Sequence, residues 1–170
     1  MSKTLTRVTY SIFTVIISLA LFHSTGIAQG QEVPERTLEG VWLVKTTPRN
    51  CATGIPNPTA AFESLYTFHR DGTASASIRN ASLTVTRTAF HGLWKRELGW
   101  SDYTFRFVHL RWTTLTGAFA GKQEASGSLV LSESGNEFLT DGLNKVFDID
   151  GNLVMMGCAN SDGTRFTLDP

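Results

Sequence analysis

The sequence SDYTFRFVHLRW, residues 101–112, decides the fold class of this chain. Tyr103, Phe105 and Phe107 alternate with Thr104 and Arg106, so a large aromatic side chain recurs at every second position. Successive side chains of a β-strand point to opposite faces, and a period of two is therefore typical of a strand with one buried face. We expect a long strand here whose aromatic face lies in the protein core.

Shorter stretches of the same kind surround this segment, and glycine, asparagine and aspartate mark the turns between them. The predicted strands include residues 40–47, 62–70, 73–78, 84–88, 93–98, 122–132, 138–148, 153–158 and 164–168, with turns at 71–72, 91–92, 134–136, 150–152 and 162–163. Residues 47–61 contain three prolines and are expected to form a loop, because proline cannot donate to a sheet ladder.

No stretch after residue 28 shows a helical period, so the pattern predicts an all-β fold. Most of the predicted connections are short hairpins. We therefore expect an antiparallel up-and-down β-barrel of about eight strands, because closure removes the exposed edges that an open sheet would leave. A sandwich of two sheets is the alternative.

The N-terminus has the three parts of a secretory signal. Lys3 and Arg7 precede an apolar run over residues 8–22, and Gly26 and Ala28 fit the −3 and −1 positions of a cleavage site. A retained membrane anchor is the alternative, but the apolar run is shorter than the roughly 20 residues that span a bilayer. We expect cleavage after residue 28.

This cleavage divides the chain into a signal peptide, a flexible tether and one β-barrel domain, over residues 1–28, 29–37 and 38–170. The mature protein is expected to be periplasmic or secreted. It retains thirteen basic and fifteen acidic residues without a basic run, which argues against a nucleic-acid partner. It has no second long apolar segment, so we do not expect it to be embedded in a membrane.

Cys51 and Cys158 are the two cysteines of the chain. Export delivers them to an oxidising compartment, where a disulfide is the default expectation. Two free buried thiols or an intermolecular bridge are the alternatives.

The start and the end of the predicted barrel resemble lipocalins and the wider group of calycin barrels. Gly40-Val41-Trp42 is similar to the Gly-x-Trp signature of that family, and Gly163-Thr164-Arg165 occupies the place of its C-terminal arginine. The resemblance implies that Trp42 closes one end of the barrel and that Arg165 packs across its ring. Ser101-Asp102-Tyr103 only partly matches the family's Thr-Asp-Tyr motif.

A broader resemblance, over about residues 39–167, is to a family of small secreted bacterial proteins of unassigned function. It implies a calycin-like barrel and no particular activity. The residues that carry it are Arg49-Asn50-Cys51-Ala52-Thr53-Gly54, Thr67-Phe68-His69, Asp71-Gly72-Thr73, His91-Gly92-Leu93-Trp94, Phe147-Asp148, Gly151-Asn152 and Gly163-Thr164-Arg165.

No motif for catalysis, metal binding or cofactor binding stands out. His69, His91 and His109 are too far apart in sequence for a local metal motif, and His91 beside Gly92 is expected to fasten a turn. Residues 148–152 resemble half of a calcium loop, but a hairpin turn explains them. Asp102, Glu124 and Asp141 could pair inside a barrel for acid–base chemistry, although nothing local indicates it. We expect no catalytic residue, no metal and no cofactor.

The aromatic residues of the long strands carry the one indication of function. An eight-stranded barrel can be filled by side chains or can hold one small ligand. If the barrel holds a ligand, we expect a small apolar molecule to bind in the lumen, lined by Tyr66, Phe68, Tyr103, Phe105 and Phe107. If side chains fill the barrel, the protein would act on an unknown protein partner through the loop over residues 47–61. An enzyme that uses the barrel interior is the third hypothesis.

Overall fold

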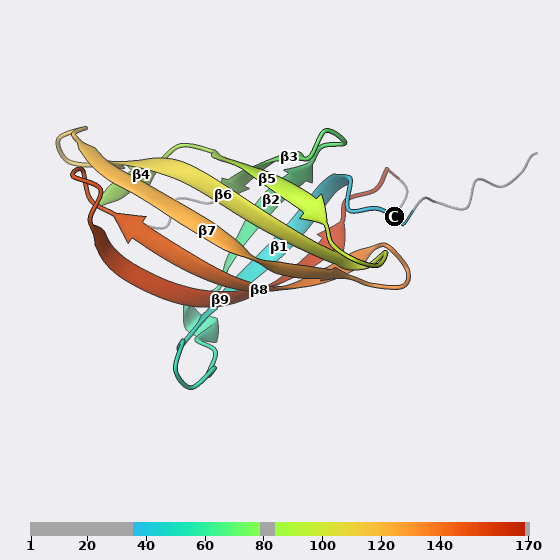
Figure 1. Cartoon of the computed structure of the whole chain (residues 1–170). Coiled ribbons are helices and arrows are strands. Elements are labelled where there is room, and N and C mark those ends of the chain that lie inside the picture. Colours follow the sequence, from blue (N-terminus) through green and yellow to red (C-terminus); the bar gives the residue numbers. More distant parts are fainter. Residues whose placement is uncertain (1–35, 79–83, 169–170) are drawn as a thin grey trace, which may run out of the picture. The chain divides into compact units, whose positions relative to one another are not determined.

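The computed structural model of the chain describes residues 36–78 and 84–168 (Figure 1). The predicted signal peptide and most of the predicted tether lie outside these residues. The elements are β1 (Gly40–Arg49), the short 3-10 turn η1 (Pro58–Ala60), β2 (Phe62–Phe68), β3 (Thr73–Ile78), β4 (Val85–Arg87), β5 (Phe90–Arg96), β6 (Asp102–Thr113), β7 (Phe119–Leu131), β8 (Glu137–Phe147) and β9 (Leu153–Arg165).

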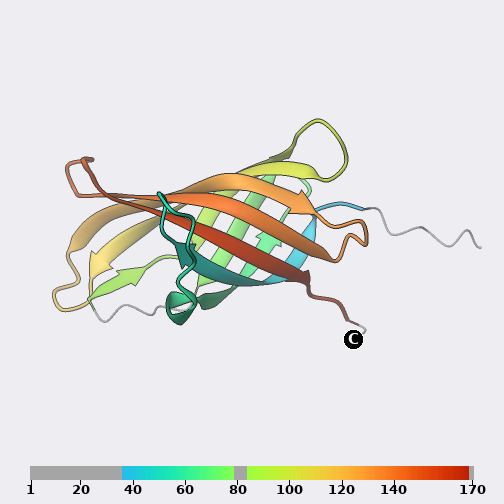
Figure 2. The same cartoon turned by 90° about the horizontal axis from the view of Figure 1, so that it is seen from below.

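The strands form one closed antiparallel barrel, which confirms the predicted fold class. Neighbours follow the order β4-β6-β5-β3-β2-β1-β9-β8-β7, and the ladder between β6 and β7 closes the sheet. Strands β4 and β5 both pair with β6, one after the other along its length, and together count as one strand of eight. Figures 1 and 2 show the strands crossing the barrel axis at a tilt, as closure of eight strands requires.

The predicted turn at His91-Gly92 is wrong, because both residues lie inside β5. His91 pairs with Ser75 of β3 and Val108 of β6, and its side chain is exposed on the outer surface. The glycine serves close packing and not a turn: a Cβ at Gly92 would lie 2.2 Å from the carbonyl oxygen of Arg106. His91 therefore does not fasten a turn.

The predicted turn at Asp162-Gly163 is also wrong, because β9 continues unbroken through it and pairs with both β1 and β8. The ring of Phe138 lies over Gly163, and a Cβ there would meet its Cζ at 2.2 Å. A glycine inside a strand pattern can mark such a close approach as well as a turn.

Strand β1 is longer than predicted and includes Pro48, which pairs with Ala159 of β9. The carbonyl of Pro48 points away from β9 and accepts a hydrogen bond from the backbone N–H of Asn57 at 2.7 Å. The N–H that proline lacks would point the same way, so the β9 ladder loses nothing.

The alternation in β6 holds as predicted. Tyr103 and Phe107 are buried inside the barrel, and Arg106 is exposed outside it. The apolar core extends from β1, β2 and β3 through β5 and β6 to β7 and β8. None of the helical segments in the described part of the chain has the length and apolar character needed to cross a membrane.

Candidate functional site

One end of the barrel is closed by Trp42, whose side chain is fully buried at the start of β1. Its indole Nε1 donates to the carbonyl of Leu38 at 2.9 Å, and its ring lies 4.9 Å from that of Phe138. The guanidinium of Arg165 lies 4.3 Å from the Trp42 ring centroid, which is the contact expected from the resemblance.

Each of the three guanidinium nitrogens of Arg165 at this closed end has a backbone acceptor. Its nitrogens donate to the carbonyl oxygens of Gly135, Glu39 and Thr37. Gly40, with a φ of +127°, provides the room, because a Cβ there would lie 2.8 Å from the arginine Nη1. The Gly-x-Trp sequence and the arginine therefore form one packed unit.

Three of the five predicted lumen residues belong to the packed core next to this unit. Phe68, Tyr103 and Phe107 are each 2% exposed or less. The ring of Phe68 lies next to those of Phe107 and Trp94, and Trp94 lies next to Tyr103. Tyr103 lies at the closed end, where its hydroxyl accepts a hydrogen bond from Nε of Arg96 at 3.1 Å.

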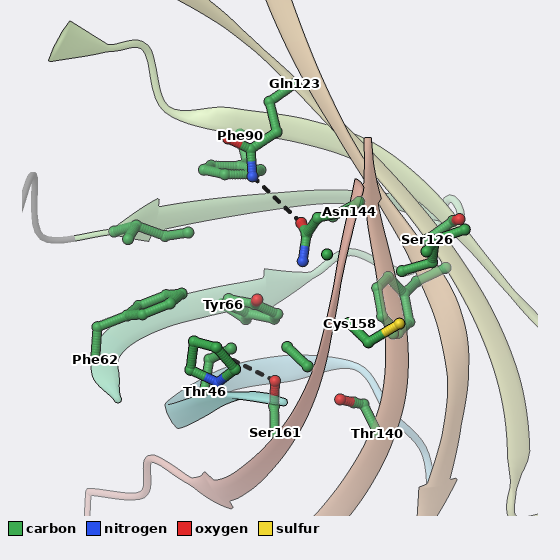
Figure 3. A pocket seen from close by; sticks show the side chains of 18 of the residues that line it. Thr46, Phe62, Tyr66, Phe90, Gln123, Ser126, Thr140, Asn144, Cys158 and Ser161 are labelled. Carbon is green, nitrogen blue, oxygen red and sulfur yellow. Dashed lines mark hydrogen bonds between the residues drawn. The ribbon is translucent and has the colours of Figure 1, made fainter. Parts of the chain in front are cut away.

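The other half of the interior holds a cavity of about 210 Å³. Tyr66 and Phe105, the remaining two predicted lumen residues, line it together with Phe62, Ile78 and Phe90. Figure 3 shows the rings of Phe62, Tyr66 and Phe90 on one side of this space. An engineered cavity of about 150 Å³ is known to hold benzene, so the volume suits a small molecule.

Hydroxyl groups form one wall of the cavity. Thr46 and Ser161 are hydrogen-bonded at 2.9 Å between β1 and β9 (Figure 3), and both side chains are buried. Burial raises the pKa of Tyr66 from its ordinary value, although the neighbouring hydroxyls of Thr46 and Ser64 act to lower it. These neutral groups can orient a polar atom of a bound molecule.

Two amides, those of Gln123 and Asn144, form the opposite wall, and an imidazole is in hydrogen-bond contact with the first of them. His109 stacks on Phe90 with the ring centroids 3.9 Å apart, and its Nε2 lies 3.2 Å from the Oε1 of Gln123. Gln123 donates to Asn144 at 3.3 Å (Figure 3). Burial lowers the pKa of His109 to about 4, against the hydrogen bond to Gln123, which raises it; the charges of Arg87 and Arg111 lower it further. The imidazole is therefore neutral at pH 7.

Arg87 completes this wall with Arg111 beside it, and sequence reasoning missed both. They are directly opposite on β4 and β6, and Arg87 lines the cavity. Side chains at paired positions lie on one face of a sheet, so Arg111 points inward as well. The alternation along β6 that places Phe107 inside also places His109 and Arg111 inside, and this signal could have indicated Arg111.

The acids considered for catalysis lie outside the barrel. Glu124 pairs with Arg106 at 2.7 Å on the outer surface, Asp141 pairs with Arg49 there, and Asp102 is exposed. No three histidine, cysteine or acidic side chains come together as metal ligands within residues 36–78 and 84–168.

The disulfide Cys51–Cys158 is present, with 5.2 Å between the Cα atoms, and confirms the predicted pairing. It fastens the loop after β1 to β9, and Cys158 lies on the border of the cavity. This loop carries η1 and projects from the barrel (Figure 1). The bridge therefore belongs to the half of the molecule that holds the cavity.

Comparison with models of known protein families gives no match for this chain, and a search of curated proteins finds no relative. The fold and the site alone define the class: a small closed β-barrel with one packed end and one end that contains a cavity.

Proposed function

We propose that this chain is an exported, lipocalin-like protein that binds a small, mostly apolar molecule inside its barrel. The observation that carries this proposal is the cavity of about 210 Å³ between Tyr66, Phe90 and Phe105. Ligand sites in proteins are typically concave, mostly apolar and supplied with a few polar groups. The hydroxyl wall and the amide wall supply such groups here.

Two observations support export. The predicted signal sequence stands at the N-terminus, and the disulfide Cys51–Cys158 is of the kind that persists in oxidising compartments. N-terminal sequencing of the exported protein should begin at residue 29 or within two residues of it. An intact Met1 in a membrane fraction would contradict cleavage.

Ligand-observed NMR with a panel of small aromatic compounds tests the binding function. Toluene, indole, benzamide and benzoate fit the cavity volume, and we expect at least one to bind. Ala125 lines the cavity, so Ala125→Phe should fill it and abolish binding. Ala60 is exposed on η1, and Ala60→Phe, the matched control, should leave binding unchanged. Absence of binding by every compound would remove the proposal.

A second function is favoured by the loop between β1 and β2. Residues 51–60 are exposed, yet the disulfide and the side chain of Asn50, which accepts from the N–H groups of Ala52 and Thr53, hold them in place. A fixed, exposed loop that presents Ile55 suits contact with a protein partner. Failure of the whole ligand panel would favour this function over the first.

A further inference from the structure

Arg87 lines the cavity, and Arg111 is its direct partner on β6, so two positive charges lie side by side next to the cavity. Directly opposite like charges destabilise a strand pair, so their juxtaposition inside a barrel has a cost. Both side chains are half-buried, which reduces the screening that water would give. A counter-charge is therefore expected nearby.

The described part of the chain supplies no such counter-charge. Its five ion pairs all lie elsewhere, on Arg49, Arg70, Lys95, Arg106 and Lys122. His109, on which both arginines act, is neutral, and the side chains that line the cavity with Arg87 are aromatic, aliphatic, hydroxyl or amide groups. The charges acting on Arg87 include no acid, and burial followed by repulsion from Arg111 lowers its pKa.

Buried side-chain nitrogens that lack hydrogen-bond partners lie mostly in this same region. Within residues 36–78 and 84–168, four buried side-chain nitrogens have no hydrogen-bond partner, and three of them are Arg87 Nε, Arg111 Nε and His109 Nδ1. Buried polar groups in folded proteins are nearly always paired, so three unpaired nitrogens in one region are suited to contact a polar group of a ligand. Arg165 at the other end shows that this barrel can satisfy an arginine when no ligand is involved.

We propose that Arg87 and Arg111 form an anion site and that the natural ligand is a small organic acid, a carboxylate on an aromatic or short aliphatic body. This inference rests on the binding function proposed above and names its ligand class. Guanidinium groups bind carboxylates through paired, charge-assisted hydrogen bonds. The body of the ligand would lie against Phe90, Tyr66 and Phe105, in a volume that suits about one aromatic ring.

Calorimetric titration of the full chain with matched pairs of compounds tests this assignment. Benzoate and hexanoate are the anions, and benzamide and hexanol are their neutral counterparts. We expect each anion to bind at least tenfold more tightly than its counterpart. The preference should decrease as salt is raised from 20 to 200 mM, since both arginines are only half-buried.

Arg87→Gln and Arg111→Gln should each weaken benzoate binding about tenfold or more and leave benzamide binding unchanged. Arg106→Gln is the control, because Arg106 lies on β6 beside this site but points outward to Glu124. A thermal scan without ligand accompanies each variant. It should show Arg111→Gln folded and at least as stable as the parent chain, which a structural role for this arginine would not allow.

The possible failures are distinguishable. Equal binding of benzoate and benzamide, both lost in Ala125→Phe, would overturn the anion site and leave the binding function in place. Binding of no compound in either series would overturn both. Benzoate binding that survives in the Arg87→Gln/Arg111→Gln double variant would also overturn the assignment, because the carboxylate would then have another partner.

Discussion

The two ends of this barrel differ in whether their arginine side chains have hydrogen-bond partners. At the closed end Arg165 stacks on Trp42 and donates to three backbone carbonyls. At the cavity end Arg87 and Arg111 face each other with their Nε atoms unpaired. A buried cation whose donor groups are all paired contributes to stability. One with unpaired donor groups destabilises the fold, and natural selection retains it only where it serves another purpose. This contrast supports a folding role for the closed end and the ligand-binding role that we propose for the cavity end.

The largest expected effect is loss of the disulfide that holds the cavity end. Cys51 and Cys158 are 107 residues apart, and chain-entropy arguments assign such a loop about 4 to 5 kcal/mol of stability. The Cys51→Ser/Cys158→Ser variant should lose this much free energy of unfolding, measured by urea titration. Ligand binding should fail at lower urea than the intrinsic tryptophan fluorescence changes. An unchanged urea midpoint would show that packing alone holds this end.

The next effect concerns the closed end, where Trp42→Ala should cost about 3 to 5 kcal/mol because the indole is fully buried. A double-mutant cycle with Trp42→Leu and Arg165→Ala isolates the contact between the two side chains. The coupling should be about 0.5 to 2 kcal/mol. Leu139→Ala on the outer surface is the control and should change little. A coupling of zero would mean that the arginine acts through its hydrogen bonds alone.

The closed end is also the part that the sequence predicts best. The sequence places Trp42 at the start of the first strand, and closure of a meander makes the first and last strands neighbours. Arg165 is predicted at the start of a strand over residues 164–168 but ends β9 instead, opposite Trp42, and the contact between the two side chains is the one that the resemblance implied. Prediction succeeds here because the pattern is local and the closure rule is general.

Prediction fails where glycine packs against a neighbour instead of turning the chain. Gly92 and Gly163 lie inside β5 and β9, under the backbone of Arg106 and the ring of Phe138. Nothing in the sequence near either glycine identifies the distant group that requires the space. Local sequence therefore cannot distinguish a turn from a close approach.

Tyr66 and Phe105 were predicted to line the lumen and do line the cavity, but Arg87 beside them escaped prediction for a related reason. Arg87 pairs with Arg111 of β6, and His91 pairs with Val108. His91 is four residues after Arg87, whereas Val108 is only three residues from Arg111, so one extra residue forms a bulge between β4 and β5. The bulge interrupts the period of two, and the inward direction of Arg87 could not be obtained from alternation along its own strand. The pair exists only through the register with β6.

A third prediction uses the pKa of His109 to probe the cavity end. The folded value is about 4 and the ordinary value is 6.5, so between these pH values the unfolded chain binds a proton that the native protein does not. The free energy of unfolding should therefore fall as pH decreases from about 6.5 to 4, by about 2 kcal/mol after solvent screening. Urea titrations across this range measure it.

His91→Gln is the control for this experiment, because His91 is exposed on the outer surface. It should retain the full acid sensitivity, whereas His109→Gln should reduce the dependence between pH 6.5 and 4. Equal pH dependence in the two variants would show that carboxylates elsewhere cause the loss and that His109 is not buried in its neutral form.

The smallest effect has the most informative sign. Arg111→Met removes one of two opposed charges and a buried Nε without a partner, and it keeps a chain of similar length in the barrel. Like charges directly opposite on two strands cost up to about 1 kcal/mol. We therefore expect the variant without ligand to be more stable by about 0.5 to 1 kcal/mol, with a Tm higher by about 2 to 4 °C. Urea titration and a thermal scan measure the two quantities.

Two comparisons make this sign interpretable. Arg106→Met removes an outward arginine of the same strand and its ion pair with Glu124, so it should be neutral or slightly destabilising. The Arg87→Met/Arg111→Met double variant should gain less than the sum of the single variants, because the repulsion between the two charges can be removed only once. A loss of stability in Arg111→Met would place this arginine with Arg165 as a structural group, and the contrast between the two ends of the barrel would then be wrong.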